Sequence, residues 1–104
     1  MPAKKVDAEK MRVAAGEATA LLRVLSNEDR LLLLCQISQG ECSVGELAEQ
    51  LDIQQPTLSQ QLAVLRNQGM VATRREGKFI YYSVEDEKVL FLLKALYGLY
   101  CPQN

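Results

Sequence analysis

The spacing of apolar residues changes its period at Gly69, and this change limits the folds open to the chain. Before Gly69 the apolar residues recur with the spacing of amphipathic helices, and four helices are predicted there. After it, MVATRR and KFIYYSV have the alternation of short strands, which predicts a β-hairpin joined by Glu76-Gly77. A helical pattern returns over residues 86–101. The chain is therefore predicted to be mostly α with one β-hairpin (α+β).

The middle of the chain has the end signals of two short helices separated by a tight turn. Ser43 and Glu46 form a capping-box pattern at the start of the first helix, and Asp52-Ile53 makes the turn. Pro56 is expected at the first position of the second helix, where its missing N–H costs nothing, and Gly69 ends that helix. The core face of the second helix is formed by three leucines: Leu58, Leu62 and Leu65.

Two helices joined by a short turn and followed by a hairpin describe a winged helix-turn-helix. The predicted order is α-α-α-α-β-β-α, with the helix-turn-helix at about residues 43–68 and the wing at about 70–84. A length of 104 residues suits one domain spanning 1–104.

An earlier helix is predicted within SNEDRLLLLCQISQG. Ser26 followed by Asp29 resembles a capping box, and Gly40 suits the position just beyond the end of a helix. The unbranched leucines before Cys35 favour a helix that is buried on most sides.

The first and last helices are the predicted dimer contacts. Residues 6–25 are rich in Ala, which fits either an amphipathic core helix or one that also packs on a second subunit. Apolar residues cover nearly the whole circumference of the helix at residues 86–101. Because such a terminal helix must be covered, a second copy of the chain is its natural partner, and a homodimer is predicted.

Composition argues against an enzyme. The chain has no His, so it lacks the usual zinc ligand and the usual general base. No nucleophile-elbow, P-loop or dinucleotide-binding pattern is present either. We therefore predict no catalytic residue, no cofactor and no metal site. The N-terminus has no apolar run typical of a secretory signal. The apolar stretches of the sequence are too short to span a membrane, so a cytoplasmic protein is expected.

Charge and residue type together indicate double-stranded DNA as a partner. The net charge is −1, but residues 53–83 carry four basic residues and one acid. The second helix of a helix-turn-helix lies in the major groove, where an amide can donate and accept at one base edge. Gln is also a common surface residue, so the prediction depends on the whole cluster. The candidate base-contacting residues are Gln54, Gln55, Thr57, Ser59, Gln60 and Gln61, of which Ser59 could instead lie at a helix–helix contact.

The hairpin adds three basic residues near its tip. Arg74, Arg75 and Lys78 are candidates for contacts with phosphates beside the groove, although a solvated hairpin tip would also carry such charges. Tyr81 and Tyr82 are expected on opposite faces of their strand.

The segments LSNEDRLLLL, SVGELAEQLDIQQPTLSQQLAVLRNQGMV and REGKFIYYSV resemble the second helix, helix-turn-helix and wing of the ArsR/SmtB family of transcriptional repressors. The resemblance covers about residues 20–101. It implies a homodimer built on the first and last helices that binds a palindromic operator and releases it on sensing a signal. One metal site of that family uses a Cys-x-Cys pair, but Ser43 and Gly45 occupy those two positions here. Another site of the family needs His, which the chain lacks, so neither metal site is predicted.

Two further motifs, LLLLCQ and LYCP, resemble the BigR-like subgroup, whose members respond to reactive sulfur species or oxidants. The resemblance implies that Cys35 and Cys101 form a sensing dithiol, which persulfide or peroxide would convert to a disulfide or polysulfide bridge. Cys35 could instead be an inert core residue, and Cys42 is interpreted as a bystander. Two alternatives stay open: a soft-metal (arsenite-type) repressor that uses the cysteines, and a winged-helix module that binds protein.

Overall fold

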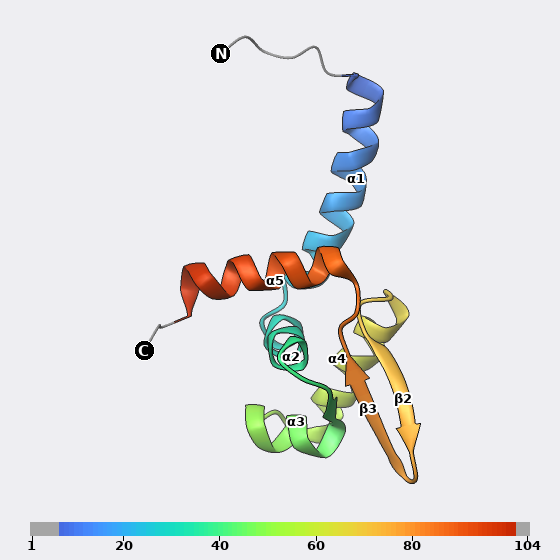
Figure 1. Cartoon of the computed structure of the whole chain (residues 1–104), viewed down its shortest axis with the longest axis vertical. Helices are drawn as coiled ribbons and strands as arrows, with labels where there is room; N and C mark the ends of the chain where they lie inside the picture. The colour runs from blue at the N-terminus through green and yellow to red at the C-terminus, as the bar shows by residue number, and fades with distance from the viewer. Residues whose placement is uncertain (1–6, 102–104) are drawn as a thin grey trace.

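The computed structural model describes residues 7–101, and over these residues the chain forms five helices and three strands in the winged helix-turn-helix arrangement that the sequence predicts (Figure 1). Val6, the predicted start of the first helix, and Pro102 lie outside the described residues. The elements are α1 (Ala8–Leu25), α2 (Glu28–Ser38), β1 (Cys42–Ser43), α3 (Val44–Leu51), α4 (Gln55–Asn67), β2 (Ala72–Glu76), β3 (Phe79–Ser83) and α5 (Glu87–Tyr100).

The helix-turn-helix has the predicted local signals with one shift. Ser43 and Glu46 form the full capping box, and Asp52 ends α3 in the left-handed conformation with φ of 53°. Pro56 occupies the second position of α4 rather than the first, because Gln54 is the N-cap. The second position also lacks an intrahelical N–H bond, so the ring is tolerated there.

Gly69 ends α4 as predicted. Its φ is 71°, which a glycine adopts without strain. Its N–H donates to the Arg66 carbonyl at 3.0 Å, and the Met70 N–H donates to the Leu65 carbonyl at 2.9 Å. These two bonds form a Schellman motif that turns the chain toward the hairpin.

The predicted cap of α2 is wrong by one residue. Asn27, not Ser26, is the N-cap, and its Oδ1 accepts a hydrogen bond from the Arg30 N–H at 3.0 Å. The Ser26 hydroxyl instead donates to the Arg23 carbonyl at 2.8 Å, at the end of α1. With only two residues between the helices, Ser26 is used by the helix that precedes it.

The sheet has one strand more than predicted. β1 pairs with β3, aligning Cys42 with Tyr82 and Ser43 with Tyr81, and the strand order is β1-β3-β2. The predicted hairpin turn is also shifted by one residue. Glu76 pairs with Phe79. The turn is therefore the two residues after Glu76, and Gly77 supplies the left-handed φ of 62° at its first position.

The core lies between α2, α3, α4 and the start of α5. The leucine face of α4 is buried as predicted, and α2 contributes Leu33, Leu34 and Ile37. Val89 and Leu93 bring α5 onto this cluster. The packing places α4 next to the hairpin (Figure 1), and the polar residues of its N-terminal half are exposed.

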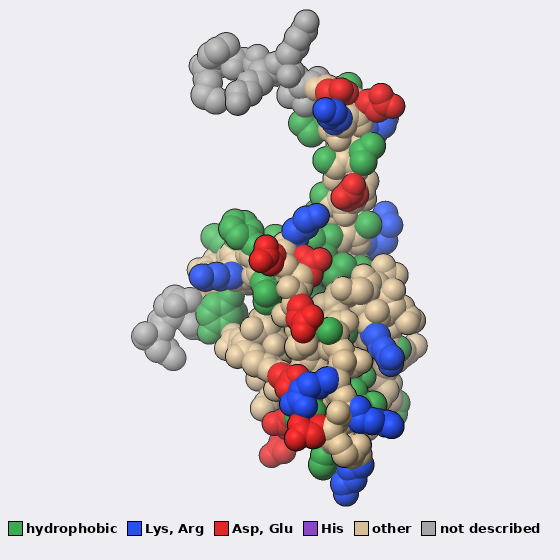
Figure 2. All heavy atoms as spheres, turned by 45° about the vertical axis from the view of Figure 1, so that its right-hand side comes forward, with side chains coloured by type: hydrophobic (Ala, Val, Ile, Leu, Met, Phe, Trp, Pro, Cys, Tyr) green, Lys and Arg blue, Asp and Glu red, His purple; other side chains and the backbone are tan. Residues whose placement is uncertain are grey.

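Helices α1 and α5 leave much apolar surface uncovered. In Figure 1 most of α1 projects away from the rest of the molecule, and Figure 2 shows apolar side chains along it and around α5. Of α1 only Val24 and Leu25 are buried, whereas Val13 is 59% exposed. On α5, Phe91 is 78% and Leu99 is 76% exposed. A soluble chain this small rarely exposes so many large apolar side chains without a partner to cover them.

Within residues 7–101, none of the helices combines the length and apolar composition needed to cross a lipid bilayer.

Candidate nucleic-acid interface and thiol site

The polar face of α4 is open along its N-terminal half. Five of the six predicted base-contacting side chains are exposed: Gln54, Gln55, Thr57, Ser59 and Gln60. Gln54 is the N-cap but its side chain makes no capping bond, so its amide is available to a ligand. Ser59 is exposed and does not lie at a helix–helix contact.

Gln61 has a different environment from the other five residues. It is half-buried, and its Oε1 accepts a hydrogen bond from Arg30 Nη1 at 3.2 Å. This bond joins α4 to α2. The prediction that Gln61 contacts DNA therefore competes with a structural role that the sequence pattern did not indicate.

Arg30 connects three helices. Besides Gln61, its guanidinium donates from Nε to the Val24 carbonyl at 2.7 Å and from Nη2 to the Arg23 carbonyl at 3.3 Å. Those carbonyls belong to the last turn of α1, where helices leave carbonyls without intrahelical donors. A position at the start of α2 thus ties α1, the predicted dimer helix, to α4.

The three basic residues of the wing are not equivalent. Arg74 lies in an ion-pair cluster in which its guanidinium bonds Glu41 at 2.7 and 2.8 Å and Glu76 at 2.6 Å. It also covers the Tyr81 ring, with 4.7 Å from its guanidinium carbon to the ring centroid. The hydrogen bond from Arg74 lowers the pKa of the Glu41 carboxyl, and the two carboxylates raise the pKa of Arg74. The positive charge of Arg74 is therefore largely paired with carboxylates of the protein itself.

Arg75 and Lys78 are both exposed at the tip of the hairpin. Within residues 7–101 neither forms an ion pair, and Lys78 Nζ lies 5.7 Å from the Phe79 ring centroid. Figure 2 shows basic side chains at this end of the molecule, with acidic ones beside them. We call the exposed polar set of Gln54, Gln55, Thr57, Ser59, Gln60, Arg75 and Lys78 the α4–wing surface.

Cys35 and Cys101 are brought to one place by the packing of α2 against α5. Cys35 is half-buried on α2, and Cys101 is the half-buried C-cap of α5, its N–H donating to the Tyr97 carbonyl at 3.0 Å. Both line one cavity of about 280 Å³, which we call the thiol cavity. Its lining is mostly apolar: Glu28, Leu31, Leu32, Cys35, Leu96, Tyr97, Tyr100 and Cys101.

The electrostatics of the thiol cavity keep Cys35 protonated. Burial raises the pKa of the Cys35 thiol, and the nearby Cys101 raises it further because a second negative charge is unfavourable there. None of the described cysteines is held in a disulfide. Since the thiolate is the nucleophile, the resting Cys35 thiol reacts slowly at neutral pH.

Cys42 belongs to another part of the molecule. It lies on β1 with its side chain buried in the core, and its Sγ donates to the Gly40 carbonyl at 3.2 Å. Burial raises the pKa of its thiol, and the carboxylates of Glu46 and Glu41 raise it further. Among residues 7–101, no group of three or more Cys, His, Asp or Glu side chains is placed to hold a metal ion.

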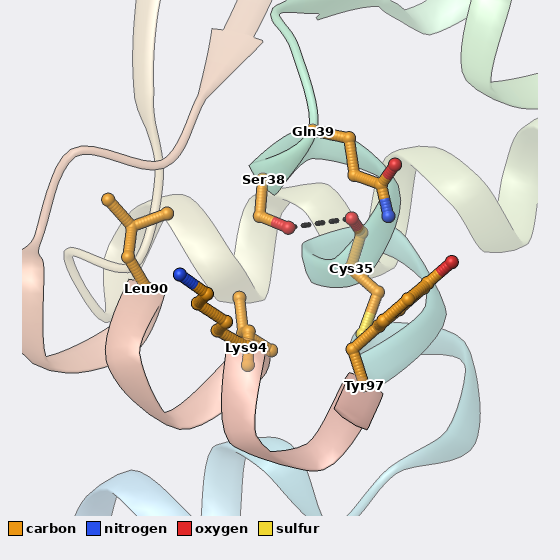
Figure 3. A pocket seen from close by; sticks show the side chains of 7 residues that line it. Cys35, Ser38, Gln39, Leu90, Lys94 and Tyr97 are labelled. Atoms are coloured by element: carbon orange, nitrogen blue, oxygen red, sulfur yellow. Dashed lines mark hydrogen bonds between the residues drawn. The ribbon is translucent and has the colours of Figure 1, made fainter. Parts of the chain in front are cut away.

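A second cavity, of about 270 Å³, also opens on Cys35 (Figure 3). Its other lining residues are Ser38, Gln39, Leu90, Leu93, Lys94 and Tyr97. The sequence pattern alone did not single out Lys94 or Tyr97 as site residues. With Leu90 they have the spacing i, i+4 and i+7, which places all three on one face of α5, the face turned to α2. We call this space the Lys94 cavity.

Comparison with known proteins gives consistent matches over most of the chain. Residues 27–73 match the family described as "Bacterial regulatory protein, arsR family". The chain is 52% identical over 91 residues to the biofilm growth-associated repressor of Agrobacterium fabrum. The aligned region covers 88% of this chain and 78% of that protein.

Two solved structures are also similar. The transcriptional repressor BigR from Xylella fastidiosa superposes with a TM-score of 0.84 at 48% identity, covering 94% of this chain and all of that one. Reduced HlyU from Vibrio cholerae gives a TM-score of 0.86 at 38% identity, covering 90% and 99%.

Proposed function

The chain belongs to the ArsR family of bacterial regulatory proteins, and on that basis we propose that it is a repressor switched by its Cys35–Cys101 dithiol. It is a transcriptional repressor of this family, not an enzyme, and it resembles BigR. The proposal concerns three finer points: how it contacts its operator, what it senses and how the two are connected.

In the proposed complex a homodimer formed through α1 and α5 binds a palindromic DNA operator. Two copies of α4 enter successive major grooves, and the amides and hydroxyls of the α4–wing surface bond base edges. Arg75 and Lys78 contact phosphates beside each groove. The exposed apolar side chains of α1 and α5 support the dimer, because a second copy would cover them.

The proposed signal is a reactive sulfur species such as a low-molecular-weight persulfide. One thiolate of the pair attacks the outer sulfur of the persulfide and releases the carrier as a thiol, leaving a cysteine persulfide. The second thiolate then attacks the protein-bound cysteine sulfur and expels hydrosulfide. The two thiols are thereby oxidised to a disulfide while the persulfide is reduced to a thiol and hydrosulfide.

The bridge would connect α2 covalently to α5. Because Arg30 on α2 bonds both α1 and α4, a change in the position of α2 would alter how the recognition helices sit on the dimer. A coupling of about 1–3 kcal/mol, typical of allosteric proteins, would weaken operator binding by about 5- to 150-fold.

One observation carries this proposal: Cys35 and Cys101, on different helices, line a single mostly apolar cavity, and the nearby Cys101 raises the pKa of Cys35. An inert core cysteine would need no such neighbour. Cys42 lines neither this cavity nor the Lys94 cavity.

The test is fluorescence anisotropy with a labelled DNA fragment from upstream of the protein's own gene, before and after glutathione persulfide. Wild-type protein should lose binding on treatment and regain it with a reductant. Cys35→Ser and Cys101→Ser should bind like the untreated wild type and stay bound after treatment.

Cys42→Ser is the matched control, because serine keeps the hydrogen bond to the Gly40 carbonyl and removes the thiol. It should respond like the wild type. If either Cys35→Ser or Cys101→Ser still releases DNA normally, the dithiol switch is wrong. Loss of the response in Cys42→Ser would point to a three-thiol site instead.

A further inference from the structure

The Lys94 cavity differs from the thiol cavity in the chemistry of its walls. Cys35 and Tyr97 line both spaces. The thiol cavity adds mainly leucines and Cys101, whereas the Lys94 cavity adds Ser38, Gln39 and Lys94. Cys35 therefore has its partner thiol on one side and a group of hydrogen-bonding side chains on another.

The polar groups of the Lys94 cavity are suited to an anion. Figure 3 shows the Gln39 amide and the Lys94 ammonium on different sides of the Cys35 side chain. Both groups supply N–H donors. The Ser38 hydroxyl already donates its hydrogen to the Cys35 carbonyl at 2.7 Å, so it has no hydrogen left for an anion. Lys94 is the cationic donor of the cavity. No acidic residue lines this cavity, in contrast to Glu28 in the thiol cavity.

The volume of the cavity limits what can enter. About 270 Å³ is slightly below the usual range of ligand pockets, which begins near 300 Å³. The space takes a molecule of amino-acid size, or the cysteinyl end of a small peptide thiol, with the remainder outside. Leu90 and Leu93 offer an apolar wall to the carbon chain of such a molecule.

We propose that the Lys94 cavity is the docking site for anionic low-molecular-weight persulfides, in which Lys94 holds a carboxylate of the carrier and the outer sulfur is presented to Cys35. This inference rests on the proposed function and assigns an order to it. Cys35 is the attacking residue and Cys101 the resolving one.

The order follows from the two openings. The Cys35 thiolate attacks the outer sulfur, the bond between the two sulfurs of the carrier breaks, and the carrier leaves from the Lys94 cavity as a thiolate. The Cys101 thiolate reaches Cys35 from the thiol cavity and displaces hydrosulfide as the disulfide forms. The incoming carrier and the resolving thiol thus do not compete for one space.

Docking through Lys94 makes the reaction depend on the charge of the carrier. Neutral hydrogen peroxide would gain nothing from the ammonium, and a cationic carrier would be repelled by it. Replacement of Lys94 by an acid should therefore reverse the preference among persulfides and leave the reaction with peroxide unchanged.

The experiment measures the rate of crosslinking of the full chain by mass spectrometry after rapid alkylation, at low ionic strength. The reagents are glutathione persulfide, cysteamine persulfide and hydrogen peroxide. Lys94→Glu should lower the rate with glutathione persulfide by about tenfold and raise the rate with cysteamine persulfide, an effect that salt screens. Lys94→Gln should give an intermediate loss, which keeps the test informative if the acid destabilises α5.

Lys88→Glu is the matched control, because Lys88 is an exposed lysine on the same helix but lines a different cavity, beside α1. It should leave all three rates close to wild type. Equal changes for the three reagents in Lys94→Glu, or no change, would overturn the docking site while leaving the dithiol switch intact. Failure of the wild type to crosslink with any persulfide would overturn both.

Discussion

The α4–wing surface and the thiol cavity are opposite in physical character. The surface is exposed, polar and formed by residues close together in the chain, from Gln54 to Lys78. The cavity is mostly apolar and joins residues 28–35 to residues 96–101. The proposed roles fit this difference: a surface that binds DNA needs side chains free to change partners, whereas a thiol pair that waits for a specific oxidant needs shielding from water.

In the proposed switch, α2 is the element that connects the two regions. Its first turn contains Arg30, which bonds the carbonyls of α1 and the amide of Gln61 on α4. Its later turns contain Cys35 and face both cavities. A displacement at Cys35 would then be passed along this short helix, because Leu33, Leu34 and Ile37 are packed in the core with little room to move independently.

The largest effect is expected from removing both free wing cations. Arg75→Ala combined with Lys78→Ala should lower operator affinity by roughly 100- to 1,000-fold at low salt, since four phosphate contacts are lost per dimer. The slope of log affinity against log salt should become shallower by about 0.9 for each lost contact. Anisotropy over a salt series measures both quantities. An unchanged slope would remove the wing from the DNA interface.

The next effect separates two neighbouring amides. Gln60→Ala should weaken specific binding by about 1–3 kcal/mol, the usual value of a bidentate base contact, and leave non-specific binding unchanged. Gln61→Ala should mainly lower the free energy of unfolding, by about 0.5–1.5 kcal/mol, because it loses the bond from Arg30. Titrations with operator DNA and with scrambled DNA, together with separate urea-unfolding curves, distinguish the two variants. Equal losses on both DNAs would exclude base readout by Gln60.

A third effect concerns the reactivity of the thiol pair. Because the pKa of Cys35 is raised, its thiolate fraction at neutral pH is small and grows about tenfold for each pH unit below that pKa. The crosslinking rate should rise with this slope through neutral pH. Stopped reactions analysed by mass spectrometry measure it. A rate that is flat between pH 6 and 8 would mean that the attacking thiol is already ionised.

The smallest effect is expected at Arg74. Arg74→Gln should reduce operator affinity less than Arg75→Gln does, because Glu41 and Glu76 already pair with the Arg74 charge. The same anisotropy series compares the two variants. A larger loss for Arg74→Gln would mean that its ion pairs open on DNA and that the α4–wing surface is wider than the free structure indicates.

The helix-turn-helix could be predicted because its signals are local. The capping box of Ser43 and Glu46, the left-handed Asp52 and the Schellman motif at Gly69 all use hydrogen bonds between residues close in sequence. Local bonds of this kind depend little on the rest of the fold. The burial of Leu58, Leu62 and Leu65 and the exposure of Gln60 followed from the same local periodicity, since the leucines fix which face is buried.

The omitted strand and the misjudged side-chain environments came from contacts that join distant parts of the chain, whereas the errors at Ser26, Pro56 and the hairpin turn were shifts of one residue. The strand β1 is only two residues long and exists because it pairs with β3, so it has no periodicity to detect. Glu41 meets Arg74, and Arg30 meets Gln61, more than thirty residues apart in sequence. Sequence placed these side chains on surfaces; the tertiary packing decided whether each surface faces solvent or another helix.

The cysteines mark the same division. Sequence alone placed Cys35 and Cys101 on two different predicted helices, and a family resemblance suggested that these two act together. Only the packing of α2 on α5 placed Cys35 and Cys101 in one cavity, left Cys42 in the core and put Lys94 beside Cys35. Helices form from short-range hydrogen bonds and apolar spacing, but the meeting of two helices depends on how all the core side chains fill space together.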